Sequence, residues 1–216
     1  MKISPSILDA NFQNLQKEID SIAAADRIHL DIMDGNFVPN LSFGPPVFRK
    51  IKFPISIEAH LMVKNPELFF EDFLKFEKIF GITFHAEIFP EKKILEILHF
   101  LKLKKICAGI CFDADTKLEN FSEKIFAAAE KILLMSVRAG FGGQKFRPEV
   151  FEKIKFLRQK NFKKEIEIDG GVNLENAPKL KKAGADIAVV GSFLMKKNPT
   201  DREKIIREFQ KINFKN

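Results

Sequence analysis

One short stretch of the chain, Ile28-His29-Leu30-Asp31-Ile32-Met33-Asp34-Gly35, begins with polar and apolar residues in alternation. Side chains of a β-strand point alternately to its two faces, so His29 and Asp31 share one face and the intervening leucine and isoleucine the other. Polar groups on a buried face need partners, because unpaired burial is costly. The alternation therefore predicts a strand that packs its apolar face on helices and turns its polar face inward.

Runs of this kind recur along the chain and alternate with longer stretches in which apolar residues return every three or four positions. The short β-branched runs predict strands, and the longer stretches predict amphipathic helices. Strands are expected at Ile3–Ser6, Arg27–Met33, Ile55–Leu61, Ile82–Ala86, Ile106–Cys111, Lys131–Val137, Glu165–Asp169 and Ile187–Gly191. Helices are expected at Phe12–Ala24, Pro66–Phe80, Ile94–Leu103, Glu149–Gln159, Leu174–Ala183 and Arg202–Ile212.

Strands that alternate with helices pair in parallel through right-handed crossovers, which leaves an open doubly wound sheet or a closed barrel. No glycine-rich dinucleotide fingerprint follows the first predicted strand, which argues against the open sheet. Polar residues instead gather at the carboxyl ends of many strands, as they do in barrels. We therefore expect an α/β fold, a (β/α)8 TIM barrel, with residues 1–216 forming a single catalytic domain.

The composition limits where the protein works. Its 45% hydrophobic and 30% charged residues suit a soluble protein with a sizeable core. No apolar run approaches the roughly 20 residues that cross a bilayer, and the amino terminus turns polar too early for a secretory signal. We therefore expect a cytoplasmic protein without a membrane partner.

The formal net charge of +7 raises the question of a nucleic-acid partner. The lysines, however, are scattered among helical segments and lack the interleaved aromatic residues of a base-stacking surface. We expect a solvated basic face that helps to attract an anionic substrate, and no nucleic-acid partner.

More polar side chains stand near the ends of two other predicted strands. Glu58 and His60 alternate on one face of the third strand, and Asp169 ends the seventh. The predicted metal ligands are His29, Asp31, His60 and Asp169. Two imidazoles and two carboxylates suit Zn(II), Fe(II), Co(II) or Mn(II). Glu58 is a candidate to orient His60, because metal-binding histidines usually have such a partner.

The other two histidines are open to different interpretations. His85 and Glu87 repeat the spacing of His29 and Asp31, and they are either further ligands or a hydrogen-bonded pair at the rim. His99 lies in a helical pattern rich in leucine and phenylalanine, and we expect it to be structural.

Glycines follow three of the predicted strands. Gly140-Phe141-Gly142-Gly143 comes after the sixth strand, Gly170-Gly171 after the seventh and Gly191-Ser192 after the eighth. Glycine permits conformations in which successive N–H groups converge on an anion. Loops after strands seven and eight are the usual phosphate site of these barrels. A phosphate-bearing substrate is therefore expected here.

At these positions the chain resembles the ribulose-phosphate 3-epimerase family over nearly its whole length. The resemblance rests on several segments in the same order: Ser4–Leu8, His29–Asn40, His60–Val63, Gly140–Phe146, Asp169–Val172 and Gly184–Asp186. It implies an isomerase of carbohydrate metabolism, in the pentose phosphate pathway, that interconverts D-ribulose 5-phosphate and D-xylulose 5-phosphate. It also implies a homo-oligomer, either a dimer or a hexamer.

The resemblance implies roles for individual residues. One divalent metal ion (Zn, Fe(II), Co or Mn) would be bound by His29, Asp31, His60 and Asp169, and the acid–base pair would be Asp31 and Asp169. Substrate contacts are implied for Ser6, His60, Gly140, Phe141, Gly142, Gly143, Asp169, Gly170, Gly171, Gly191 and Ser192. The methionines implied to line the reacting centre are Met33, Met62 and Met135.

The chain also departs from the family pattern. Arg138-Ala139 stands where a proline is common before the glycine stretch, which should raise the entropy of that loop and add a cation near the phosphate. Glu58 replaces a more usual aspartate, and Ala25-Asp26 lacks the customary glycine. None of these changes touches a predicted acid, base or ligand.

Epimerisation at C3 of a ketose phosphate removes a proton from one face and returns one to the other. Two carboxylates on opposite sides act as base and acid, and a divalent ion stabilises the enediolate as a Lewis acid. The alternatives are a 3-epimerase of a hexulose 6-phosphate, an amino-acid biosynthesis isomerase on the same kind of barrel, and a non-catalytic basic nucleic-acid-binding barrel. The metal-type residue set argues against the second, and the scattered lysines argue against the third.

Overall fold

The computed structural model describes residues 1–213 and contains an eight-stranded parallel sheet. Each strand pairs with its sequence neighbour from β2 to β8, and β8 pairs with β1. The strands are β1 (Lys2–Pro5), β2 (Ile28–Met33), β3 (Ile57–Met62), β4 (Ile79–His85), β5 (Cys107–Phe112), β6 (Lys131–Met135), β7 (Glu165–Asp169) and β8 (Ile187–Val190).

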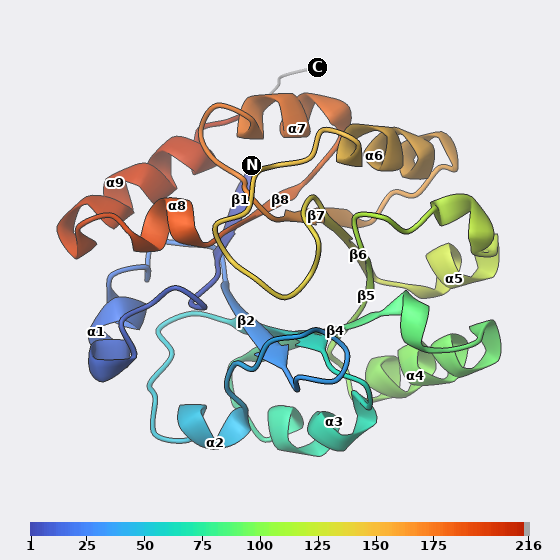
Figure 1. Cartoon of the computed structure of the whole chain (residues 1–216), viewed down its shortest axis with the longest axis horizontal. Coiled ribbons are helices and arrows are strands. Elements are labelled where there is room, and N and C mark those ends of the chain that lie inside the picture. The colour runs from blue at the N-terminus through green and yellow to red at the C-terminus, as the bar shows by residue number, and fades with distance from the viewer. Residues whose placement is uncertain (214–216) are drawn as a thin grey trace.

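The ring closes where the end of β1 meets β2. Ser6 forms an isolated parallel bridge with His29, and the Ile7 N–H donates to the His29 carbonyl oxygen at 3.4 Å. Figure 1 shows the strands as a ring with the helices around its outside. The predicted TIM barrel is therefore confirmed.

The helices that connect these strands include several that the sequence patterns did not indicate, among them two short ones, α2 and α5. The α-helices are α1 (Leu15–Asp20), α2 (Pro45–Phe48), α3 (Glu67–Leu74), α4 (Glu91–Leu103), α5 (Glu123–Ala128), α6 (Val150–Gln159), α7 (Ala177–Ala183), α8 (Ser192–Met195) and α9 (Pro199–Gln210). Short 3-10 turns are η1 (Phe12–Asn14), η2 (Ala86–Ile88) and η3 (Leu118–Asn120). Within residues 1–213, none of the helices combines the length and the apolar character needed to cross a membrane.

The predicted helix Pro66–Phe80 is wrong at its carboxyl end. α3 stops at Leu74, and β4 begins at Ile79, which pairs with Ile57 of β3. The apolar spacing of this segment continues past the helix, so periodicity alone does not separate its last residues from a strand. Pairing with β3 decides the boundary.

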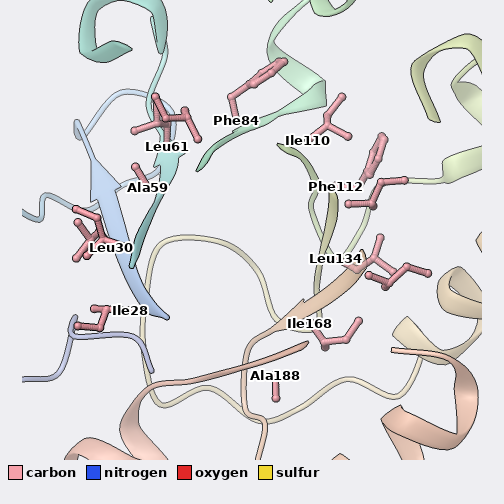
Figure 2. Close-up of a cluster of buried hydrophobic side chains, with 14 of the residues drawn as sticks. Ile28, Leu30, Ala59, Leu61, Phe84, Ile110, Phe112, Leu134, Ile168 and Ala188 are labelled. Carbon is pink, nitrogen blue, oxygen red and sulfur yellow. The ribbon is translucent and has the colours of Figure 1, made fainter. Parts of the chain in front are cut away.

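The alternation in β2 is resolved as expected. Leu30 and Ile32 are buried in the apolar layer between the strands and the helices. In Figure 2, Leu30 and Phe84 point outward from the ring of strands. Burial of each such large side chain contributes about 1.5–3 kcal/mol. His29 and Asp31 point the other way and meet side chains of β3 and β7 inside the barrel.

Charged side chains fill the interior near the amino-terminal ends of the strands. Lys131 of β6 is buried, and its Nζ lies 2.6 Å from Glu58 Oε2 and also contacts Glu167 Oε2. Arg27 reaches Glu58 at 3.4 Å. We call this cluster of Arg27, Glu58, Lys131 and Glu167 the barrel floor. Burial alone would lower the pKa of Lys131, but Glu167 and Glu58 raise it above its usual value, so the ammonium stays charged.

Candidate active site

A cavity of about 340 Å³ opens at the opposite mouth, where the carboxyl ends of the strands meet. Met33, Met62 and Asp169, the last residues of β2, β3 and β7, line it, and so do the loops that follow β6, β7 and β8. In Figure 1 the loop between β6 and α6 lies across this mouth. Barrels of this type place their active sites at this end.

Four side chains converge beneath the cavity. His29 Nε2 lies 3.4 Å from Asp31 Oδ1 and 3.8 Å from Asp169 Oδ2. His60 Nδ1 lies 3.2 Å from the same Asp31 oxygen and 3.7 Å from the same Asp169 oxygen. The four ligand atoms fall within 4.8 Å of one another. The structure thus brings together all four residues predicted as ligands, and we call them the mouth cluster.

The chemistry of the mouth cluster fits a divalent ion. His29 Nε2 is buried and has no hydrogen-bond partner among the described residues, although buried polar atoms are normally paired. The other nitrogen, Nδ1, lies 3.0 Å from Glu58 Oε1. With a metal bound, Glu58 would accept the Nδ1 proton and the Nε2 lone pair would face Asp31 and Asp169. A metal ion between two imidazoles and two carboxylates would use that lone pair.

The two aspartates differ in their affinity for a proton. Burial alone would raise the pKa of Asp31, but the adjacent imidazoles of His29 and His60 hold it well below its usual value. Burial, together with the nearby charge of Asp31, raises the pKa of Asp169 to about 7. At neutral pH one carboxylate is ionised while the other can hold a proton. Such divergence is typical of carboxyl pairs that act as base and acid.

The three glycine loops form the rim of the cavity, and two glycines fix how they meet. The φ angles of Gly170 and Gly171 are +114° and +62°. A Cβ on Gly170 would lie 2.5 Å from the Val137 side chain, and one on Gly171 would lie 2.7 Å from Phe146 N. Because only glycine fits such contacts, the loop after β7 packs directly on the loop after β6. The predicted loop residues that line the cavity are Gly140, Phe141, Gly142, Gly143, Gly170, Gly171, Gly191 and Ser192.

Comparison with known proteins decides the family. The model of the ribulose-phosphate 3 epimerase family matches residues 2–195. The chain belongs to the ribulose-phosphate 3-epimerase family. It is 38% identical to ribulose-phosphate 3-epimerase of Helicobacter pylori over 218 residues, which cover 98% of each chain. It is 36% identical to that of Bacillus subtilis, over 97% of this chain and 98% of the relative. Membership of this family makes the protein an isomerase.

Solved structures agree on the fold. The 3-hexulose-6-phosphate synthase of Salmonella typhimurium aligns with a TM-score of 0.69 at 14% identity, over 98% of each chain. A mutant tryptophan synthase α-subunit of Pyrococcus furiosus aligns with a TM-score of 0.66 at 16% identity, over 98% of this chain and 97% of that one. At these identities the likeness shows the barrel alone.

In this epimerase-family barrel, apolar groups surround the two aspartates. Met33, Met62 and Met135 line the cavity, each 5% exposed or less, and belong to one apolar cluster. Ser6 donates from Oγ to Asp31 Oδ2 at 2.5 Å. The predicted Ser6 and methionine positions thus all line the cavity above the two aspartates, with Met135 beside Asp169 in the strand register.

Several residues that line the epimerase cavity are not among those predicted from the sequence. They are Leu8, Asp9, Asn173, Val189 and Lys196. Among the described residues that line the cavity, Lys196 alone carries a positive charge. Arg138, expected to add a cation near the phosphate, does not line the cavity; it is exposed, and its guanidinium lies 3.4 Å from Asp115. Lys196 directly follows α8, so its direction depends on how that helix ends.

The expected partner of His60 was also wrong. Glu58 contacts His29 because these two residues stand side by side in neighbouring strands. The side chain of His60 contacts His85 of β4, with 3.0 Å between their Nε2 atoms. In the backbone register, His60 stands beside Thr83 of the same strand. Sequence separation alone suggested Glu58, whereas the register of β2 and β3 decides the contact.

Proposed function

We propose that the protein interconverts D-ribulose 5-phosphate and D-xylulose 5-phosphate by exchanging a proton at C3. The observation that carries the proposal is the pair of carboxyl groups under the cavity, one ionised and one able to hold a proton. Such a pair can remove a proton from one face of a carbon and supply one to the other.

Each aspartate has one role in each direction of the reaction. In one direction, Asp31 takes the C3 proton, and the electron pair of the C–H bond moves toward C2 to give an enediolate. Asp169 then delivers a proton to C3 from the opposite face, and in the reverse direction the two exchange roles. The Ser6 hydroxyl, which donates to Asp31 Oδ2, keeps the other Asp31 oxygen toward the histidines.

One divalent ion, Zn(II), Fe(II), Co(II) or Mn(II), would be held by His29, Asp31, His60 and Asp169 and supply Lewis acidity next to the reacting carbons. The methionines around Asp31 offer polarisable contacts without acidic protons. They exclude water from the carbon that loses its proton, which protects the enediolate from stray protonation.

The rim of the cavity would hold the phosphate. Gly142, Gly143, Gly171 and Ser192 line the cavity, and Lys196 brings a positive charge to the same lining. Backbone amides position a phosphate, and an ammonium adds attraction that acts over a longer range. A fixed phosphate places the sugar so that C3 lies between the carboxylates.

We also propose a homo-oligomer, a dimer or a hexamer, in the cytoplasm, with residues 1–216 as one catalytic domain. The cytoplasmic location is supported by a rice relative named as the cytoplasmic isoform of ribulose-phosphate 3-epimerase, 38% identical over 89% of this chain and 86% of the relative. We propose no membrane or nucleic-acid partner, because the charge is dispersed over helical segments.

A coupled assay tests the function. D-ribulose 5-phosphate is offered to the purified protein, and D-xylulose 5-phosphate is measured, with metal analysis of the same sample. We expect turnover that is lost on chelation and restored by one of the four metals. A parallel assay with a hexulose 6-phosphate determines the preferred chain length. Absence of turnover on the pentulose phosphate in metal-reconstituted protein would refute the proposal.

A further inference from the structure

His60 is the first of three buried or mostly buried side chains that are linked in a chain, followed by His85 and Glu87. His60 Nδ1 faces the mouth cluster, 3.2 Å from Asp31 Oδ1, while Nε2 on the other side of the ring lies 3.0 Å from His85 Nε2. His85 Nδ1 in turn lies 3.3 Å from Glu87 Oε2. Both imidazoles are fully buried, and the Glu87 side chain is 25% exposed. The chain therefore runs from the metal-type cluster through β4 to η2.

The far end of this chain determines which nitrogen of His85 donates a hydrogen bond to Glu87. The other Glu87 oxygen, Oε1, accepts from the Asp113 N–H at 2.8 Å and from the Thr116 hydroxyl. Burial alone would raise the pKa of Glu87, but its hydrogen bond to His85 lowers it to about 2, so Glu87 is ionised and acts only as an acceptor. His85 Nδ1 must then donate to it.

The remaining protons follow from the tautomers of neutral imidazole. A neutral ring has one N–H and one lone pair, so His85, which donates from Nδ1, accepts at Nε2. His60 Nε2 must therefore carry a proton and donate it. This leaves the lone pair of His60 on Nδ1, the nitrogen that faces Asp31 and Asp169.

We propose that His85 and Glu87 are positioning residues that hold His60 in the Nε2–H tautomer and direct its Nδ1 lone pair at the metal. The inference rests on the metal site of the proposed function, but not on the reaction catalysed there. His29 is held in the opposite sense, because its Nδ1 contacts Glu58 and its Nε2 faces the cluster. The two histidines thus turn different nitrogens toward the metal. Glu58 contacts the other nitrogen of His29 directly, whereas His85 lies between His60 and Glu87.

Packing also fixes the orientation of His85. The Phe37 ring lies against it, with ring centroids 4.6 Å apart. The His60 and His85 rings are nearly parallel, at 20°. Rotation of His85 would break both ring hydrogen bonds and this contact, so the ring is held from three sides.

A different arrangement, in which His85 is itself a ligand, is disfavoured by its neighbours. His60, His85 and Cys111 form another group whose ligand atoms lie close together. Burial raises the pKa of the Cys111 thiol well above its usual value, so it does not offer a thiolate. His85 does not line the cavity, and its Nε2 lies at hydrogen-bond distance from His60.

The test is Co(II) binding by the metal-free protein, measured as a dissociation constant and as the visible absorption spectrum of the bound ion. His85→Phe keeps the ring and removes both nitrogens, whereas His85→Gln retains an amide acceptor for His60 and a donor for Glu87. We expect His85→Phe to weaken binding by about 10–100-fold and change the spectrum, as loss of a ligand's supporting partner does. His85→Gln should stay within about fivefold of the unmodified protein.

Two further variants complete the design. Glu87→Gln should weaken Co(II) binding by about 3–10-fold, because an amide no longer fixes the His85 proton; it decides the question if His85→Phe fails to fold. His99→Gln, on the exposed face of α4, is the matched control and should leave the constant unchanged. Unchanged binding in both His85→Phe and Glu87→Gln overturns the inference. Equal loss in His85→Gln and His85→Phe overturns it too, because His85 is then a ligand.

Nitrogen-15 spectra of the Zn(II)-loaded protein give a direct readout. The chain has four histidines, so single variants assign each ring. We expect the non-ligand protons on Nδ1 of His29, Nε2 of His60 and Nδ1 of His85. A proton on His60 Nδ1 contradicts the inference. Neither measurement uses a sugar, so failure of the epimerase assay with wild-type Co(II) binding would refute the proposed function and leave the tautomer question to these data.

Discussion

Two clusters of buried polar side chains, the mouth cluster and the barrel floor, lie inside the barrel, and His29 of the mouth cluster connects them. In the mouth cluster it faces Asp31 and Asp169, and on its other side it meets Glu58 of the barrel floor. His29, Glu58 and Glu167 have ligand atoms within 4.8 Å of one another, as the four residues of the mouth cluster do. The floor and the mouth cluster differ in what lies between their carboxylates.

In the floor, the protein supplies its own cation. The Lys131 ammonium lies between Glu58 and Glu167, so the negative charge there is balanced by a covalently attached group. In the mouth cluster no lysine or arginine of residues 1–213 forms an ion pair with Asp31 or Asp169, and His29 Nε2 has no hydrogen-bond partner there. A buried cluster of this kind signals function when its charge balance is left to an exchangeable ion and a cavity gives access to it.

A substitution in the mouth cluster should lower activity strongly without lowering the stability of the fold. Asp169→Asn should lower kcat by about 10²–10⁴-fold, because one face of C3 loses its proton carrier. The metal-free variant should unfold at no lower urea concentration, since a carboxyl whose pKa is raised by burial costs free energy when it ionises. Turnover and urea denaturation of the same preparation measure both. Wild-type turnover would show that Asp169 is not the proton carrier.

A substitution in the barrel floor should mainly lower the stability of the fold. Lys131→Met removes the cation between the Glu58 carboxylate and Glu167, whose pKa is raised to about 8 by burial and by the charge of Glu58, and should lower the free energy of unfolding by about 3–5 kcal/mol. Urea denaturation measures this, and the double variant Lys131→Met with Glu167→Gln should recover part of the loss because one carboxylate is removed. A Lys131→Met protein as stable as the unmodified one would break the distinction between the two clusters.

The expected effect at Glu87 is intermediate between those at the mouth cluster and at the floor, because Glu87 contacts His85, which in turn contacts His60 of the mouth cluster. Its hydrogen bond to His85 lowers the pKa of Glu87 in the folded protein to about 2, from its ordinary value of 4.5. Its contribution to stability is therefore fully present above about pH 4.5 and is lost as the pH falls through about 2. Compared with Glu87→Gln, the unmodified protein should lose an advantage of about 2–3 kcal/mol over this window. A difference in unfolding free energy that does not change between pH 5 and pH 2.5 would contradict the assignment.

The smallest effect is expected at the rim. Lys196→Gln should raise KM for the pentulose phosphate by about tenfold with little change in kcat, because a rim charge adds binding rather than chemistry. It should also weaken the dependence of kcat/KM on salt concentration. Lys197→Gln, one residue further along and outside the cavity lining, is the matched control. Equal effects of the two variants would show that Lys196 acts only through net charge.

The sequence was most informative where side-chain alternation alone determines which way a residue points. His29 and Asp31 were predicted to face inward because their neighbours are apolar, and the structure agrees. Glu167 alternates with Asp169 in the same way, so the sequence also indicates that Glu167 faces the interior. The end of α3 could not be predicted, because apolar spacing there suits a helix as well as the strand that pairs with β3.

Contacts between strands were beyond the sequence. Whether Glu58 reaches His29 or His60 depends on the register of β2 and β3, and whether His85 supports His60 depends on β4. Lys196 was missed because the short helix α8 sets its direction. These contacts join residues far apart in the chain, and no local pattern encodes them.

The bridge between Ser6 and His29 closes the ring at the very residues that surround the reacting carbon. Elsewhere neighbouring strands share a run of paired residues, whereas β1 and β2 meet through this single bridge. Binding of an ion or a sugar at His29 and Asp31 should therefore also stabilise the contact between β1 and β2, where the barrel has the fewest paired residues. Ligand binding should slow hydrogen exchange of the Ile7 amide, which bonds to His29, more than that of amides in the β5–β6 ladder. In this molecule, ligand binding in the active site and closure of the ring are therefore expected to be thermodynamically linked.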